Sequence, residues 1–283
     1  MDGYYAGRVA VVTGAGSGIG QALAIRLAHV GAALALLDID GPAAQDTARQ
    51  CREAGARAQA WTADVTDHEA LAGCAAEVAV SLGRVSRLFG AAGVIHTGTV
   101  LASRYETARR VIEVNLLGVM ATVDAFLPAL AAPGGGHVVL MSSGFGLLAM
   151  PRFAAYSASK FGVRGYAEAL AQEMALGGHQ VRVTCVYPGV VRTPILRRGT
   201  FAEGENQDAA VTGFDRLART SPAEAAESIL RQARQGKARA LVGLDARAAA
   251  LAERALGGAC QRLVPRAARI FRDHARQKGR HLG

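Results

Sequence analysis

The stretch VAVVTGAGSGIG at residues 9–20 joins a short apolar run to a glycine-rich turn. The apolar run predicts a buried strand, and the Ala- and Leu-rich residues that continue to Val30 predict a helix. Glycines between a strand and a helix let the backbone approach a diphosphate closely, while the helix N-terminus offers free N–H groups and a favourable dipole. The stretch therefore predicts a dinucleotide site, although the same glycines also fit a tight turn without a ligand.

The same alternation of strand and helix continues along the chain. We expect strands at residues 9–12, 33–37, 58–61, 85–89, 138–141, 181–186 and 240–242. Helices are expected at residues 18–30, 43–54, 69–81, 104–130, 154–176 and 222–235. This rhythm predicts a single doubly wound, Rossmann-like α/β domain, with a parallel seven-stranded sheet and helices on both faces. We place it at residues 1–244, with a lid or substrate loop at about 191–219, and a basic, helical C-terminal extension at 245–283, broken at Gly257-Gly258 and Pro265.

The composition excludes several classes of protein. The chain has 283 residues, 51% hydrophobic and 19% charged, which suits a globular core and argues against disorder. No uninterrupted apolar run of about 20 residues predicts a membrane span, and residues 1–5 lack an export signal, so we expect a cytoplasmic protein. The four cysteines have neither C-x-x-C spacing nor a nearby histidine, so we expect reduced thiols and no metal site.

The positive charge belongs to the C-terminal region. The net charge is +9, and residues 231–283 hold 13 Lys and Arg against three Asp and Glu. No nucleic-acid-binding motif accompanies this charge, so we expect no nucleic-acid partner. A basic helix with Ala267, Ile270, Phe271 and His274 on one face also fits peripheral membrane contact, although packing on the main domain or a second subunit is favoured.

Asp38 indicates which of the two nicotinamide cofactors, NAD or NADP, is bound. It lies 18 residues beyond Gly20, at the end of the second expected strand, where a carboxylate accepts hydrogen bonds from an adenosine ribose and repels a 2′-phosphate. No Lys or Arg occupies residues 13–21 or 37–41, so NAD is predicted over NADP. A plain turn residue is the alternative. Asp64, after the third strand, fits an adenine contact and a helix cap equally well.

Tyr156 and Lys160 carry the predicted chemistry. A spacing of four places both on one helix face, and a nearby cation favours the phenolate of a tyrosine acting as a base. The alternative is a tyrosine that simply packs on the helix. Ser143, at the carboxyl end of the fifth strand, is placed to bind a substrate oxygen, with Ser142 as a competing hydroxyl. Asn115 is a polar residue inside an apolar helix and is a further candidate for the site. The alternative is a hydrogen-bonded core amide that bends the helix.

Taken together, T-G-x-x-x-G-x-G at residues 13–20, Asn115, Ser143, Tyr156-x-x-x-Lys160 and Pro188-Gly189 resemble the short-chain dehydrogenase/reductase family over most of residues 8–243. The resemblance implies that Tyr156 is the acid/base, that Ser143 orients the substrate oxygen, that Lys160 binds ribose and lowers the tyrosine pKa, and that Asn115 holds a water in a proton relay. Thr193 would contact the nicotinamide carboxamide. A homodimer or homotetramer is also implied.

The cofactor set that this resemblance implies is Gly14, Ser17, Gly18, Ile19, Gly20, Asp38, Asp64, Val65, Ala92, Gly93, Tyr156, Lys160, Pro188, Gly189, Val191 and Thr193. The chain departs from the family in one place: Gly90-Ala91-Ala92-Gly93 stands where Asn-Asn-Ala-Gly is usual. The missing amide removes a structural hydrogen bond without removing a catalytic group.

The expected activity is reversible hydride transfer between NAD(H) and a secondary alcohol or ketone, with an apolar or hydroxysteroid-like substrate. Phe145, Met150, Phe153 and Val190 are expected to line its pocket. His96 fits either the pocket lining or a surface loop, and the surface loop is the favoured interpretation. The alternatives are a non-catalytic NAD-binding sensor or scaffold, and a 3-oxoacyl-type reductase.

Overall fold

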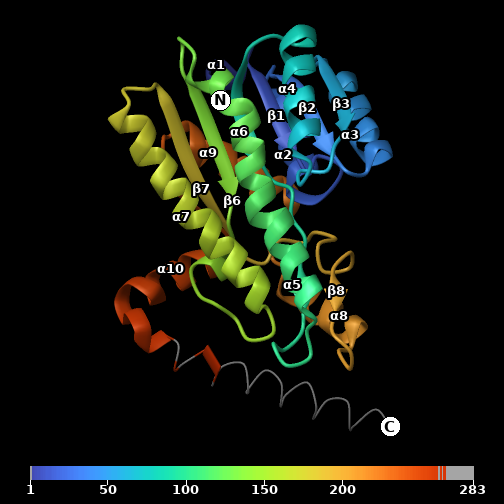
Figure 1. The fold of residues 1–283 in the computed structure, drawn as a ribbon, viewed down its shortest axis with the longest axis vertical. Helices are drawn as coiled ribbons and strands as arrows, with labels where there is room; N and C mark the ends of the chain where they lie inside the picture. Colours follow the sequence, from blue (N-terminus) through green and yellow to red (C-terminus); the bar gives the residue numbers. More distant parts are fainter. Residues whose placement is uncertain (1, 261, 263, 266–283) are drawn as a thin grey trace.

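The computed structural model describes residues 2–260, 262, 264 and 265 (Figure 1). Its centre is a seven-stranded sheet in the order β3-β2-β1-β4-β6-β7-β9, in which every neighbouring pair is parallel. The strands are β1 Val9–Thr13, β2 Ala33–Asp38, β3 Ala58–Thr62, β4 Val85–Gly90, β6 Gly136–Met141, β7 Val181–Pro188 and β9 Arg239–Val242. The predicted doubly wound, Rossmann-like sheet is therefore confirmed.

Helices cover both faces of the sheet. Successive strand residues point to opposite sides of the sheet, so each face presents apolar side chains on which helices pack. Ala10 and Val12 of β1 join one apolar core, and Val9 and Val11 join the other. The first core includes residues of α2 Gly18–His29, α3 Gly41–Glu53 and α9 Pro222–Arg234, with Tyr5 of the short helix α1 Asp2–Tyr5. The second includes residues of α4 His68–Ser81, α6 Gly118–Ala131 and α7 Ala154–Leu176.

The helix expected at residues 104–130 contains an irregular turn. It consists of α5 Tyr105–Ile112, a π-helical turn η1 Glu113–Leu117 and α6. In the described part of the chain, Tyr105–Ala131 is the one helix whose length and composition suit a membrane span, a finding that the sequence analysis did not anticipate. Core helices meet the same criterion, and Val119, Val123 and Phe126 of α6 are buried in the second core.

Several short elements surround the carboxyl ends of the strands, where Figure 1 shows both α8 and α10. A second, two-stranded parallel sheet pairs β5 His96–Thr97 with β8 Thr200–Phe201. The expected lid contains β8 and also α8 Gln207–Leu217, whose first turn is capped by Asn206. The remaining elements are η2 Gly144–Gly146, α10 Leu244–Leu256 and η3 Gly257–Ala259.

The expected break of the C-terminal extension at Gly257-Gly258 coincides with the end of α10. Residues Ala267, Ile270, Phe271 and His274, on which the membrane-contact interpretation rests, lie outside the described residues.

Candidate active site

Two adjoining cavities open at the carboxyl ends of β1, β4, β6 and β7, the edge at which doubly wound sheets bind ligands. The reaction cavity, about 300 Å³, is lined by Ser143, Tyr156 and Lys160. The dinucleotide cavity, about 330 Å³, is lined by the glycine-rich turn after β1 and by Asp38. Ile19, Ala91, Gly93, Thr193 and Ile195 line both cavities, so a ligand in one reaches the other.

Tyr156 and Ser143 meet in the reaction cavity. Tyr156 stands in the first turn of α7, and its hydroxyl is hydrogen-bonded to Ser143, which follows β6 by two residues. Burial raises the pKa of Tyr156 to about 12, and the hydrogen bond with Ser143 opposes that rise. The oxygen of Ser143 also accepts a hydrogen bond from the backbone N–H of Phe145 at 3.1 Å, which fixes its position.

Lys160 lies one turn beyond Tyr156 and is buried. Its Nζ donates a hydrogen bond to the carbonyl of Met141 at 2.9 Å and lies 5.6 Å from the centre of the Tyr156 ring. Burial lowers the pKa of Lys160 to about 8. Ser142 donates from Oγ to the carbonyl of Lys160 at 2.8 Å, so this hydroxyl holds helix α7 against β6. Of the two candidate serines, only Ser143 is hydrogen-bonded to Tyr156.

Asn115 lies behind the cavity wall, in the π-helical turn. Its Oδ1 accepts from Val94 N at 2.8 Å, and its Nδ2 donates to Val94 O at 2.9 Å and to Ser159 Oγ at 3.1 Å. A Cβ atom on Gly93 would lie 3.2 Å from Asn115 Oδ1 and 3.5 Å from Lys160 Nζ. Asn115 is thus a hydrogen-bonded core amide that shares one small space with Lys160, and its role in a proton relay stays a prediction.

The turn after β1 is built for close approach of a ligand to its backbone. Gly14 has a φ of +66°, and a Cβ atom there would lie 2.8 Å from the backbone of Ala92. A Cβ atom on Gly20 would lie 2.0 Å from the carbonyl oxygen of Gly14. Side chains at these positions would fill the cradle at the N-terminus of α2, so the residues present fit a dinucleotide.

Asp38 holds this turn from the end of β2. Its Oδ2 accepts from Gly16 N at 2.7 Å and its Oδ1 accepts from Asp40 N at 2.9 Å. Each carboxylate oxygen has a second lone pair for a ribose hydroxyl.

Asp64 also lines the dinucleotide cavity, and the capping interpretation of it is wrong. The cap of α4 is Asp67, which accepts from Ala70 N at 3.0 Å. Asp64 instead accepts from Thr66 N at 2.9 Å and from Arg110 at 3.0 Å. Burial acts to raise the pKa of Asp64, but these hydrogen bonds outweigh burial and lower it.

The loop after β4, where the usual asparagine is missing, is held by Thr13. Its Oγ1 accepts from Ala91 N at 3.2 Å and from Ala92 N at 3.3 Å. A hydroxyl from the neighbouring strand therefore anchors this loop.

Every residue of the predicted cofactor set lines one of the two cavities. The dinucleotide cavity receives Gly14, Ser17, Gly18, Ile19, Gly20, Asp38, Asp64, Val65, Ala92, Gly93 and Thr193. The reaction cavity receives Tyr156, Lys160, Pro188, Gly189 and Val191, and shares Ile19, Gly93 and Thr193.

The apolar wall of the reaction cavity was only partly predicted. Phe145, Met150 and Val190 line it, whereas Phe153 packs behind Phe145 with the ring centres 5.2 Å apart. His96 is buried on β5, with hydrogen bonds of 2.9 Å to Thr200 and Ser103, so its interpretation as a surface histidine was wrong. The lining residues that sequence reasoning missed include Leu148, Ile195, Phe214, Asp245, Ala246 and Ala249, none of which belongs to a motif.

A doubly wound sheet with a dinucleotide cradle, and with a buried tyrosine and lysine beside a serine at its edge, defines a class: the nucleotide-dependent oxidoreductases. Residues 8–203 match the family model described as short chain dehydrogenase. The chain belongs to the short-chain dehydrogenase/reductase family.

Relatives and solved structures agree with that assignment. The chain is 43% identical over 261 residues to the putative oxidoreductase SadH of Mycobacterium tuberculosis H37Rv, covering 92% of this chain and 95% of the relative. It is 35% identical over 193 residues to mouse estradiol 17-beta-dehydrogenase 11, covering 68% of this chain and 65% of the relative. A short-chain dehydrogenase/reductase from Burkholderia phymatum, solved in complex with NAD, superimposes with a TM-score of 0.79 at 29% identity, covering 84% of this chain and 89% of that one.

Proposed function

We propose that this protein catalyses the reversible oxidation of an apolar, hydroxysteroid-like secondary alcohol to a ketone, with NAD as cofactor and Tyr156 as the acid/base. The observation that carries the proposal is the hydrogen-bonded pair Tyr156 and Ser143 in an apolar cavity that adjoins the dinucleotide cavity.

NAD fits the dinucleotide cavity better than NADP. The Asp38 carboxylate accepts from ribose hydroxyls and repels a 2′-phosphate. The glycine-rich turn and the N-terminus of α2 would hold the diphosphate, and Pro188, Gly189, Val191 and Thr193, which line the reaction cavity, would hold the nicotinamide end. The bound NAD supplies the hydride acceptor for oxidation and, when reduced, the hydride donor for the reverse reaction.

The side chains of the reaction cavity handle the proton. Ser143 Oγ accepts from Phe145 N, and its own hydrogen, which bonds with Tyr156 when no substrate is bound, would turn to the substrate oxygen and hold that oxygen beside Tyr156. Tyr156 takes the alcohol proton in oxidation and returns it in reduction. Because burial raises the pKa of Tyr156 to about 12, the phenolate depends on nearby positive charge, which Lys160 and the oxidised nicotinamide ring supply.

The lining of the reaction cavity supports an apolar substrate. Phe145, Leu148 and Met150 follow β6, while Ile195 and Phe214 come from the expected lid. Large apolar side chains around few polar groups suit a substrate that is held by burial and oriented by one hydroxyl. The relationship to a protein named estradiol 17-beta-dehydrogenase 11 supports the same class of substrate.

The test is formation of reduced nicotinamide from NAD, and separately from NADP, over secondary alcohols graded from 2-propanol to hydroxysteroids. We expect turnover with NAD that increases with apolar size and is lost in Tyr156→Phe while NAD binding persists. NAD binding without turnover on any alcohol would favour a sensor or scaffold. Preferential reduction of 3-oxoacyl thioesters would favour the 3-oxoacyl-type reductase.

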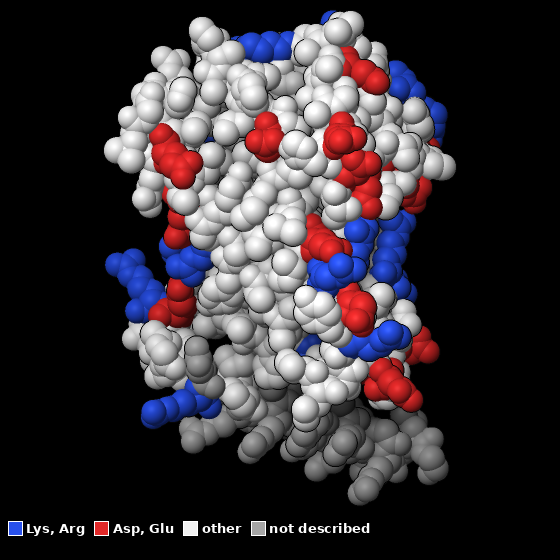
Figure 2. All heavy atoms as spheres, viewed as in Figure 1, with Lys and Arg blue, Asp and Glu red and all other residues white. Residues whose placement is uncertain are grey.

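A surface with few charged groups supports assembly into a homodimer or homotetramer. Figure 2 shows a pale band along the middle of this face, with few Lys, Arg, Asp or Glu side chains. Two large apolar side chains are exposed here: Leu117, at the end of the π-helical turn, and Phe161, on α7. Light scattering tests the assembly: Leu117→Glu should dissociate it, and Val80→Glu, on the exposed face of α4, should not.

A further inference from the structure

Asp245 stands in the first turn of α10 and reaches back to the turn that follows β7. Its Oδ2 accepts a hydrogen bond from Val190 N at 2.6 Å, across 55 positions of the chain. An acidic residue in a first turn usually stabilises its own helix. Among the described hydrogen bonds, however, this carboxylate receives its donor from the β7 turn and none from α10.

Two glycines make the space that this carboxylate occupies. A Cβ atom on Gly189 would lie 2.0 Å from Asp245 Oδ1, and one on Gly243 would lie 2.5 Å from the same atom. Gly243 also has a φ of +93°, which side chains rarely allow. The β7 turn and the start of α10 are therefore shaped around Asp245.

The carboxylate adds to the hydrogen bonds that hold the turn after β7. Gly189 N donates to Val242 O at 2.9 Å, and Arg192 N donates to Thr220 O at 2.9 Å. Val190 lies between these two anchors, and its N–H finds its acceptor in Asp245. The carboxylate thus fixes Val190 between these two backbone anchors, and a charged acceptor makes that hydrogen bond stronger than a neutral one.

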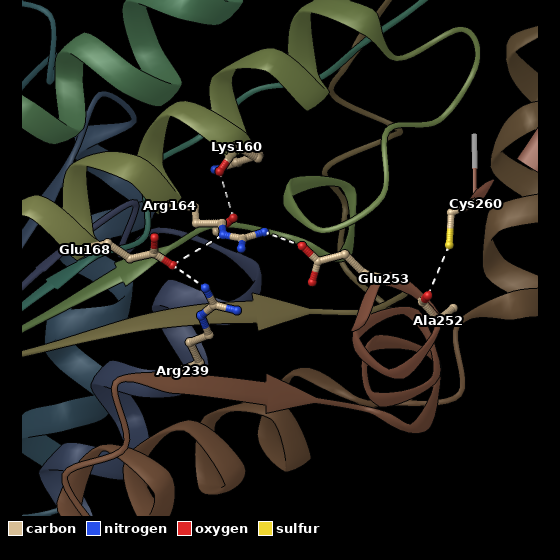
Figure 3. A network of polar contacts seen from close by, with 8 residues as sticks. Lys160, Arg164, Glu168, Arg239, Ala252, Glu253 and Cys260 are labelled. Carbon is tan, nitrogen blue, oxygen red and sulfur yellow. Dashed lines mark hydrogen bonds and ion pairs between the residues drawn. The ribbon is translucent and has the colours of Figure 1, made fainter. Parts of the chain in front are cut away.

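A second tie holds α10 to the helix that carries Tyr156 and Lys160. Glu253, two turns after Asp245, accepts from Arg164 at 2.9 Å, and Arg164 lies one turn beyond Lys160 (Figure 3). Arg164 also contacts Glu168, which accepts from Arg239 of β9 at 2.6 Å. Between the two ties, Ala246 and Ala249 line the reaction cavity. Helix α10 is therefore braced against both sides of the site.

We propose that Asp245 is a positioning residue for the nicotinamide end of the cofactor. By holding Val190, it sets the backbone of Pro188, Gly189 and Val191, against which the nicotinamide is proposed to bind. This inference rests on the proposed function, because it requires that the chain binds NAD. It also brings into the site a helix that lies outside the residues matched by the family model.

The experiment compares NAD with ADP-ribose, which has the adenosine, the diphosphate and the second ribose but no nicotinamide. Both ligands are titrated calorimetrically into the full chain, as wild type, Asp245→Ala and Asp245→Asn. We expect Asp245→Ala to weaken NAD binding about tenfold or more and to leave ADP-ribose binding within about twofold of wild type. Asp245→Asn keeps a neutral oxygen acceptor for Val190 N and should weaken NAD binding less than Asp245→Ala does.

Glu69→Ala is the matched control, because Glu69 is an exposed acidic residue in the first turn of α4. It should change neither affinity. Equal losses of both ligands in Asp245→Ala, or no loss of either, would overturn the proposal. If Asp245→Ala fails to fold, Asp245→Ser replaces it, because its shorter side chain does not reach Val190 N. A wild-type chain that binds neither ligand would refute the cofactor assignment itself, and the role of Asp245 with it.

Discussion

Lys160 donates its Nζ hydrogen bond to the carbonyl of Met141, the last residue of β6, and so joins helix α7 to the strand that precedes Ser143. Burial of this cation is costly, and one carbonyl compensates for only part of its lost hydration. The residue is therefore expected to weaken the fold while serving the site.

Lys160→Met tests that cost through its pH dependence. Because the pKa of Lys160 falls from 10.5 unfolded to about 8 folded, the destabilisation is fully present below pH 8 and is relieved as the pH rises toward 10.5. It amounts to roughly 3 kcal/mol. Urea unfolding at pH 7 and pH 9.5 should show the wild type gaining stability relative to Lys160→Met as the pH rises. The exposed Lys237→Met should keep the same difference from wild type at both pH values.

Ser143→Ala should move the pH profile of alcohol oxidation. The hydrogen bond from Ser143 lowers the pKa of Tyr156, so its removal raises that pKa and displaces the rising limb of kcat to higher pH. We also expect kcat to fall about 100-fold, since the substrate oxygen loses its donor. Steady-state rates from pH 6 to pH 10 measure both effects, and Ser142→Ala is the neighbouring control. An unchanged profile in Ser143→Ala would contradict the assignment.

Asp38→Asn should reduce the preference for NAD. The amide keeps an oxygen acceptor for Gly16 N but loses the charge that repels a 2′-phosphate. The ratio of kcat/KM for NAD to that for NADP should fall about tenfold or more. Asp40→Asn, which retains a good helix cap two residues away, should leave the ratio unchanged. A ratio that moves equally in both variants would speak against ribose recognition by Asp38.

Thr13→Val should loosen the loop after β4. The substitution keeps the shape of the side chain and removes the oxygen that accepts from Ala91 N and Ala92 N. Leaving these donors without a partner should lower the free energy of unfolding by about 1–3 kcal/mol and weaken NAD binding. Chemical unfolding and calorimetry measure the two effects. Thr47→Val, which removes a buried hydroxyl on α3, is a control for stability loss without loss of NAD affinity.

Ala249→Leu should narrow the substrate range. Ala249 lines the reaction cavity from α10, so a larger side chain takes volume from a bulky alcohol. KM for a hydroxysteroid should rise about tenfold, while KM for 2-propanol should stay within about twofold. Ala250→Leu, the next residue on the same helix, controls for general disturbance of α10. Equal effects on both alcohols would contradict the placement of the bulky substrate against α10.

The fold was predictable in the segments whose apolar residues recur with the spacing of a single type of secondary structure. The seven strands follow from short apolar runs between turn residues, and α7 Ala154–Leu176 begins and ends as expected. Helix α8 was missed because its short segment holds few aliphatic residues and its burial is slight; only Val211 is buried within it. The pairing of β5 with β8 joins residues about a hundred positions apart over two residues each, which no local pattern encodes.

The candidate site was predictable where chemistry needs a rare combination. Tyr156 and Lys160 stand four apart in a chain with three lysines, and the glycine-rich turn follows a strand directly. Asp245 carries no such signal, because its partner is a backbone N–H that every residue but proline possesses. The same holds for Thr13: its role became visible only once β1 and β4 were neighbours.

The π-helical turn at Glu113–Leu117 has a consequence for how sequences of this family can be aligned and edited. A π turn takes up one residue more than an α turn, and one residue corresponds to about 100° of rotation around a helix axis. The apolar pattern of the sequence is therefore displaced by one position between α5 and α6. Deleting a single residue within the π turn would leave an ordinary α turn, with Val119, Val123 and Phe126 still facing the core. The extra residue acts as a phase correction that lets one helix present Asn115 to the site and an unbroken apolar face to the core.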